Sequence, residues 1–109
     1  IGGSQAVGNG GAIYTLGDTM VTTTTIAGNS TTGANAHGGG VYVADANLTI
    51  TQSTISGNST TGANSDGGGI FSDTNLTDQT TELIQATISG NTSSGRAGRE
   101  IQNRLPAPH

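Results

Sequence analysis

The chain has 109 residues and contains no cysteine, no lysine and only three basic residues, Arg96, Arg99 and Arg104. The absence of cysteine excludes a disulfide framework, so the redox compartment cannot be inferred from the sequence. A net charge of −4 with no basic patch argues against nucleic-acid binding, which requires phosphate neutralisation. No apolar run approaches the roughly 20 residues that span a bilayer, so we expect no membrane insertion.

Apolar residues are also scarce, a composition that often indicates disorder. Disordered chains usually combine this scarcity with a high net charge, which is missing here. The apolar residues that are present recur at fixed positions, as polar sequence of random order would not arrange them. The composition therefore favours a folded repeat protein.

Two short phrases each occur three times, with a period of about 29 residues. One phrase is a glycine run followed by an apolar and an aromatic residue, and the other is Ile-x-Gly-Asn. Periods of this length are typical of solenoids and repeat arrays. The first phrase ends at Tyr14, Tyr42 and Phe71, and the second occupies residues 26–29, 55–58 and 88–91.

The middle repeat shows what one coil contains. Residues 40–43 are rich in β-branched and aromatic side chains, and residues 48–51 alternate apolar with polar, so both segments indicate strands. Residues 44–47 predict a tight turn, 53–55 a third strand and 59–66 a polar loop. The sequence has no helical periodicity. It therefore predicts an all-β parallel β-helix, or β-solenoid, of about three to four coils.

Stacked coils place like residues on like residues, about 4.8 Å apart. One predicted internal ladder contains Ile13, Val41, Ile70 and Ile101, and another contains Ile26, Ile55 and Ile88 and begins at Ile1. The aromatic residues Tyr14, Tyr42 and Phe71 form a third file, which an outer position would suit as well as an inner one. Asn29, Asn58 and Asn91 repeat in register and predict an asparagine ladder at a corner.

These phrases carry a resemblance to a known group. Residues 10–13 (Gly-Gly-Ala-Ile) and the Ile-x-Gly-Asn segments resemble the repeats of polymorphic outer-membrane proteins and related bacterial surface β-helix proteins. The resemblance implies a right-handed parallel β-helix in a surface, adhesive or passenger region. Residues 1–4 lack the asparagine and residues 99–101 lack the glycine run, so both ends are expected to be incomplete coils. We expect one solenoid domain over 1–103 and an extended tail over 104–109, which contains two prolines.

Five asparagines begin Asn-x-Ser/Thr sequons, the acceptor pattern of N-glycosylation. Asn47 and Asn75 lie in predicted turns and are the better exposed candidates. The other three, Asn29, Asn58 and Asn91, are assigned to the ladder instead. Asp18, Asp45 and Asp73 fall near one corner, where turn formation is favoured over a calcium column because each coil offers one carboxylate.

No catalytic, cofactor or metal site is predicted. Polysaccharide-cleaving β-helix enzymes need paired carboxylates, and the nearest pair, Asp78 and Glu82, falls in an irregular insertion. His37 and Asp66 precede equivalent glycine runs without further metal-ligating neighbours. We therefore expect a protein that is not an enzyme.

The ends of the stack suggest a function. A short β-helix leaves unpaired strand backbone at both ends, and no capping helix is predicted at either one. We expect a structural subunit of an extracellular or cell-surface fibre. Copies of the subunit stack head to tail in this fibre, and the protein carries glycans. Residues at the expected assembly ends are Ile1, Arg99, Ile101 and Leu105. The alternatives are an adhesive or passenger segment of a larger surface protein and, third, a fragment of a carbohydrate-active enzyme.

Overall fold

The computed structural model describes residues 2–73, 81–95 and 101–104. Fourteen strands and no helix occur in these ranges, and each strand pairs in parallel with the equivalent strand of a neighbouring coil. Strands about 29 residues apart are therefore neighbours in space. The predicted all-β parallel β-helix is confirmed.

Each coil contributes one strand to each of four parallel sheets. The first sheet contains β2 (Ile13–Thr15), β6 (Val41–Ala44), β10 (Ile70–Asp73) and β14 (Ile101–Arg104). The second contains β3 (Thr19–Thr22), β7 (Leu48–Thr51) and β11 (Thr81–Ile84), and the third β4 (Thr25–Ala27), β8 (Thr54–Ser56) and β12 (Thr87–Ser89). The fourth contains β1 (Gln5–Ala6), β5 (Ser30–Thr31), β9 (Ser59–Thr60) and β13 (Thr92–Ser93). We refer to β2–β5, β6–β9 and β10–β13 as the first, second and third coils.

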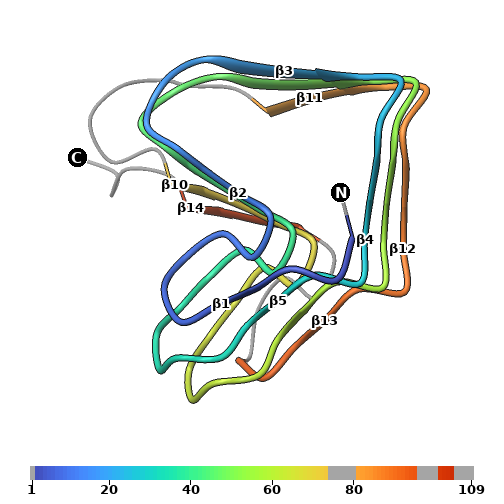
Figure 1. The fold of residues 1–109 in the computed structure, drawn as a ribbon. Coiled ribbons are helices and arrows are strands. Elements are labelled where there is room, and N and C mark those ends of the chain that lie inside the picture. Colours follow the sequence, from blue (N-terminus) through green and yellow to red (C-terminus); the bar gives the residue numbers. More distant parts are fainter. Residues whose placement is uncertain (1, 74–80, 96–100, 105–109) are drawn as a thin grey trace.

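Figure 1 looks along the stack, so that the coils nearly superimpose. The first three sheets form the sides of a triangle. The fourth sheet runs away from one corner of this triangle into a lobe, whose loops return to the start of the next coil. The triangle encloses the apolar core, whereas the lobe is built from polar and glycine-rich segments.

The core is filled by the ladders that the repeat positions predict. The register places Val41 between Ile13 and Ile70, and Ile70 opposite Ile101 of β14. Ile55 lies between Ile26 and Ile88 in the same way. In β7 the alternation of the sequence becomes an alternation of burial, because Leu48 and Ile50 are fully buried. At about 25 cal/mol per Å² of apolar surface, these ladders supply the main drive to fold.

The fourth strand corrects the expected coil of three strands and a polar loop. The sequence predicts residues 59–60 in the polar loop, but they form β9, which pairs with β5 and β13. The two-residue strand has no apolar pattern of its own, so its order comes from the coils above and below. Its inward residue Thr60 is buried, and its hydroxyl donates to the Ser65 carbonyl at 2.9 Å. The equivalent Thr31 donates to Ala36 at 2.8 Å.

The aromatic file lies on the outer face of the first sheet. Val41 and Val43 belong to the core cluster, so Tyr42 between them points to the opposite face. The rings of Tyr14, Tyr42 and Phe71 stack with centroids 5.2 and 5.3 Å apart. His37 of the lobe stacks on Phe71 at 4.4 Å. The file therefore joins the triangle to the lobe.

Close backbone packing explains the glycine runs. At Gly39 an added Cβ would lie 2.6 Å from the carbonyl carbon of Ser59, closer than real Cβ atoms approach. The end of the first coil's lobe loop can therefore lie against β9 only as bare backbone. The corner between the second and third sheets has a different requirement, because Thr23, Gln52 and Gln85 all adopt a positive φ near 50°.

The boundary of the predicted tail differs by one residue. Arg104 is the last residue of β14 rather than the first residue of a tail. Residues 105–109 lie outside the described part of the chain, as does the predicted insertion around Asp78.

Candidate functional site

Asn29, Asn58 and Asn91 form a continuous ladder of hydrogen bonds along the stack. The Oδ1 atom of Asn58 accepts from the backbone N–H and from the Nδ2 of Asn29, at 2.9 and 3.0 Å. Its own Nδ2 donates to the Ile26 carbonyl and to Asn91 Oδ1, both at 3.0 Å. Asn91 repeats the arrangement, because its Oδ1 accepts from the Asn58 N–H and its Nδ2 donates to the Ile55 carbonyl. Each asparagine thus reaches back to the backbone of the preceding coil.

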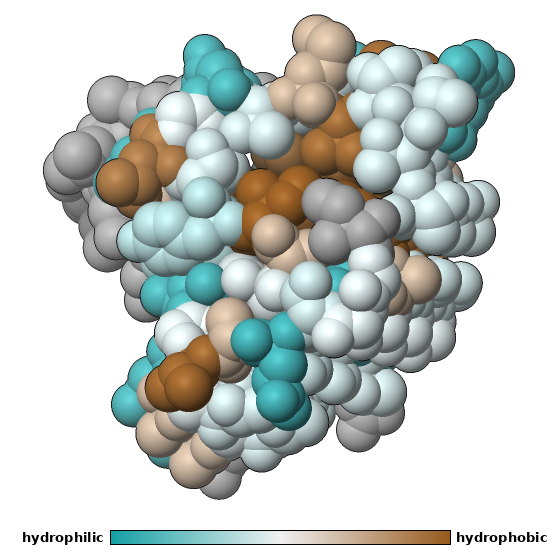
Figure 2. Space-filling view, in the orientation of Figure 1, coloured by the Kyte–Doolittle hydropathy of each residue, from teal (hydrophilic) through white to brown (hydrophobic). Residues whose placement is uncertain are grey.

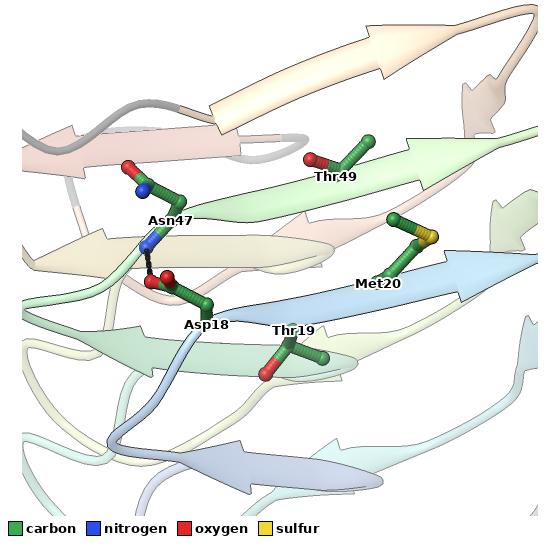
Figure 3. Close-up of a pocket in the computed structure, with 5 residues that line it drawn as sticks. All are labelled: Asp18, Thr19, Met20, Asn47 and Thr49. Atoms are coloured by element: carbon green, nitrogen blue, oxygen red, sulfur yellow. Dashed lines mark hydrogen bonds between the residues drawn. The ribbon is translucent and has the colours of Figure 1, made fainter.

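The ladder separates the sequons into two groups. Asn29, Asn58 and Asn91 are 0–3% exposed, and their amide nitrogens are engaged, so a glycan there would require the corner to open. Asn47 is half-buried at the surface and lies beside a groove of about 340 Å³ on the outer wall. Figure 3 shows Asn47 and Thr49 on the same side of β7, with Asp18 accepting from the Asn47 N–H at 2.8 Å. Asn75 lies outside the described residues.

The aspartates near the predicted turn do not line up as a column. Thr19 pairs with Leu48, so Asp18 lies at the level of Asn47, whereas Asp73 pairs with Ala44. Asp45 follows Ala44 and adopts a positive φ of 52°. The three residues therefore occupy different positions around the corner, and the described contact of Asp18 stabilises a turn of the next coil.

A second polar ladder orders the lobe loops. The N–H of His37 donates to Asn9 Oδ1 at 2.6 Å, and the N–H of Asp66 donates to His37 Nδ1 at 2.9 Å. These residues precede the glycine runs of successive coils, so each side chain accepts from the backbone one coil later. His37 and Asp66 are thus bound into the loop architecture.

Neither a metal cluster nor a membrane helix occurs in the described ranges. No three His, Cys, Asp or Glu residues there are close enough to hold one ion. No helix among the described residues has the length and hydrophobicity to span a bilayer. Glu82 lies on β11, whereas Asp78, the other member of the nearest carboxylate pair in the sequence, lies outside the described residues.

The feature left for function is the end of the stack at the first coil. Within the described residues, β2 and β3 are the last strands of their sheets and have a partner on one side only. Figure 2 shows hydrophobic side chains in the middle of this face, inside the triangle of sheets and surrounded by a more hydrophilic rim. Tyr14 is 53% exposed here, whereas Tyr42 and Phe71 behind it are 7% and 2% exposed. The ladders of stacked side chains therefore end at this face and continue into the coils behind it.

The sequence pattern did not reveal two inward threonines at this end. Thr15 and Thr19 pair with the buried Val43 and Leu48, so they occupy core positions of the first coil. The Thr19 hydroxyl donates to Thr15 Oγ1 at 3.0 Å, which gives each hydroxyl a partner within the coil. A comparison of each strand with its partner in the next coil would have identified this pair.

The opposite end presents the last strand of each sheet. In the described part, β14 covers β10, whereas β11, β12 and β13 are the outermost members of their sheets. Of the residues predicted at the assembly ends, Ile101 lies in β14 opposite Ile70. Ile1, Arg99 and Leu105 lie outside the described residues. Among the described residues, both ends therefore leave backbone edges of parallel strands unpaired, and such edges can pair with further strands.

No protein-family model, curated protein or solved structure matches this chain. The function therefore has to be argued from the geometry of the stack itself.

Proposed function

We propose that the protein is a structural subunit that stacks head to tail through the ends of its β-helix and so builds a fibre. The observation that carries this proposal is the open end at the first coil, where β2 and β3 leave one edge unpaired among the described residues. The apolar centre of the same face supplies burial for an added coil. Strand pairing and core burial together favour another solenoid end as the occupant.

A second copy fits this end because the coils of the molecule already pack on one another in the same way. Coil-to-coil contact is made by equivalent residues in parallel register throughout the stack. A contact between the first coil of one copy and the last coil of the next repeats that register. Because it joins two different ends, it does not close on itself, so a filament forms.

Electron microscopy of the purified 109-residue chain tests this proposal. We expect filaments that form above a critical concentration and show a strand spacing of about 4.8 Å along their axis. A monomer at millimolar concentration would contradict the proposal and favour the alternative, a segment of a larger surface protein. Binding of that monomer to a glycan or a surface receptor would then support an adhesive role.

A surface location and glycosylation form part of the same proposal. Asn47 and Thr49 lie on the outer wall, on either side of the buried Leu48, so a glycan on Asn47 would leave both ends of the stack open. Protein from its natural source should carry a glycan on the peptide that contains Asn47. Intact-mass measurement before and after deglycosylation tests this, and an unmodified Asn47 would remove glycosylation at this position from the proposal.

A further inference from the structure

The two ends of the described stack carry different parts of a coil. At the N-terminal end, Gly2 bridges to Ala27 of β4, and β1 pairs with β5. This half-coil covers the third and fourth sheets and leaves β2 and β3 open. At the other end, β14 covers the first sheet alone among the described residues. The C-terminal end therefore supplies the first-sheet strand that the N-terminal half-coil lacks, whereas neither end contributes a described strand to the second sheet.

We infer that the junction of the proposed fibre is one composite coil shared by two copies, an inference that rests on the proposed function. In this coil β14 of one copy pairs with β2 of the next, while β13 of the first copy pairs with β1 of the second. Extending the registers of the stack places Ile101 opposite Ile13, and Thr92 opposite Gln5. The ladder of Ile13, Val41, Ile70 and Ile101 then runs without interruption from copy to copy.

The asparagine ladder identifies the weak point of this junction. Ser30 pairs with Gln5, so Ser4 occupies the position of Asn29 in the half-coil. The N–H of Ser4 donates to Asn29 Oδ1 at 2.9 Å, which continues the ladder between the half-coil and the first coil. In the composite coil Ser4 follows Asn91 of the neighbouring copy, where an asparagine would reach back to the Asn91 N–H and the Ile88 carbonyl. The serine side chain is too short to make both bonds.

The substitution Ser4→Asn is therefore a gain-of-function test. It should restore two ladder hydrogen bonds across the junction and lower the critical concentration for assembly about tenfold. In the isolated subunit the introduced Nδ2 should donate to Asn29 Oδ1 and raise the melting temperature slightly, whereas the bonds to a preceding coil form only in the fibre. Ala63→Asn is the matched control: it introduces the same residue at an exposed turn position of the second coil, away from both ends, and should leave the critical concentration unchanged.

Cysteine pairing tests the register directly, because the natural chain has no cysteine. In the double variant Gln5→Cys, Thr92→Cys, the two exposed positions belong to β1 and β13, the outer strands of one four-stranded sheet. Three strand spacings, about 14 Å, separate them within a subunit, which is too far for a disulfide. In the composite coil the two cysteines are neighbours, so oxidation in air should give a series of covalent dimers, trimers and larger multimers. The pair Met20→Cys, Thr92→Cys should not cross-link.

The outcomes distinguish the inference from the proposed function. A lower critical concentration for Ser4→Asn together with multimers of the first cysteine pair supports the composite coil. Filaments that form without either effect overturn the composite coil and leave end-to-end stacking intact. Monomers for every variant overturn both.

Discussion

The second coil and the first coil have equivalent residues but bury them differently. Val41 is fully buried and Tyr42 is 7% exposed in the second coil, whereas Ile13 is half-buried and Tyr14 is 53% exposed in the first. The inward Val43 and Leu48 of the second coil are replaced by Thr15 and Thr19, which bond to each other. In this fold the neighbouring coils bury the side chains of each coil. The first coil lacks one neighbour over β2 and β3, about half of its length, among the described residues.

The largest expected difference concerns the asparagine ladder. Asn58→Ala removes hydrogen bonds on both sides of the second coil and should lower the free energy of unfolding by about 4 kcal/mol or more, since each unsatisfied buried group costs about 1–3 kcal/mol. Such a loss approaches the whole stability of a small domain. Asn29→Ala should cost less, because Ser4 offers it no side-chain amide. Denaturant unfolding measures both.

The exposed loop residue Asn35 provides the control for this comparison. Asn35 adopts a φ of 56°, so glycine replaces it without backbone strain and removes the same amide side chain. Asn35→Gly should change the free energy of unfolding by no more than about 0.5 kcal/mol. Equal losses for Asn58→Ala and Asn35→Gly would mean that the ladder does not stabilise the stack.

Truncation of core side chains should also destabilise the second coil more than the first, with a smaller difference in the free energy of unfolding. Ile50 is fully buried, and it pairs with Val21 of the first coil, which is 6% exposed. Ile50→Ala should lower the free energy of unfolding by about 3 kcal/mol, and Val21→Ala by about 1–2 kcal/mol, because the first site is larger and more enclosed. Urea titration of the monomeric protein gives both values, and a greater loss for Val21→Ala would contradict the assigned core.

Removing an inward hydroxyl should change the free energy of unfolding in opposite directions at two equivalent positions. Thr81 Oγ1 is buried without a hydrogen-bond partner, and its register partner two coils away is Thr19, whose hydroxyl is bonded. Thr81→Val should raise the free energy of unfolding by about 1 kcal/mol, since it removes an unsatisfied group without changing shape. Thr19→Val should lower it slightly. Thermal unfolding of both variants tests the pair, and the same sign for both would refute the assigned hydroxyl contacts.

A further small effect is expected at the corner between the second and third sheets. Thr23 adopts a φ of 49°, a left-handed conformation that β-branched residues rarely tolerate, and Gln52 adopts 50° at the equivalent corner. Thr23→Asn should stabilise the protein by about 1 kcal/mol, because asparagine accepts this conformation more readily. Gln52→Asn should gain less. A destabilised Thr23→Asn variant in differential scanning calorimetry would contradict the corner geometry.

The sequence predicts the triangle of sheets better than the lobe. The β-branched strands and the recurring Ile-x-Gly-Asn phrase indicate the parallel β-helix and the residues that stack, because identical coils place like on like. The strand Ser59–Thr60 and the loop ladder of Asn9, His37 and Asp66 have no such pattern. Their order depends on hydrogen bonds between coils, which local sequence does not encode. The Thr15–Thr19 pair was missed for the same reason.

The most direct test of end-to-end stacking is the axial rise of the assembled chain, measured by cryo-electron microscopy. Three full coils and one composite coil per subunit predict a β-helix whose first and fourth sheets continue from subunit to subunit, with a rise of about 19 Å, four strand spacings. A discrete monomer, or a filament in which the β-helix is interrupted between subunits, would contradict the account.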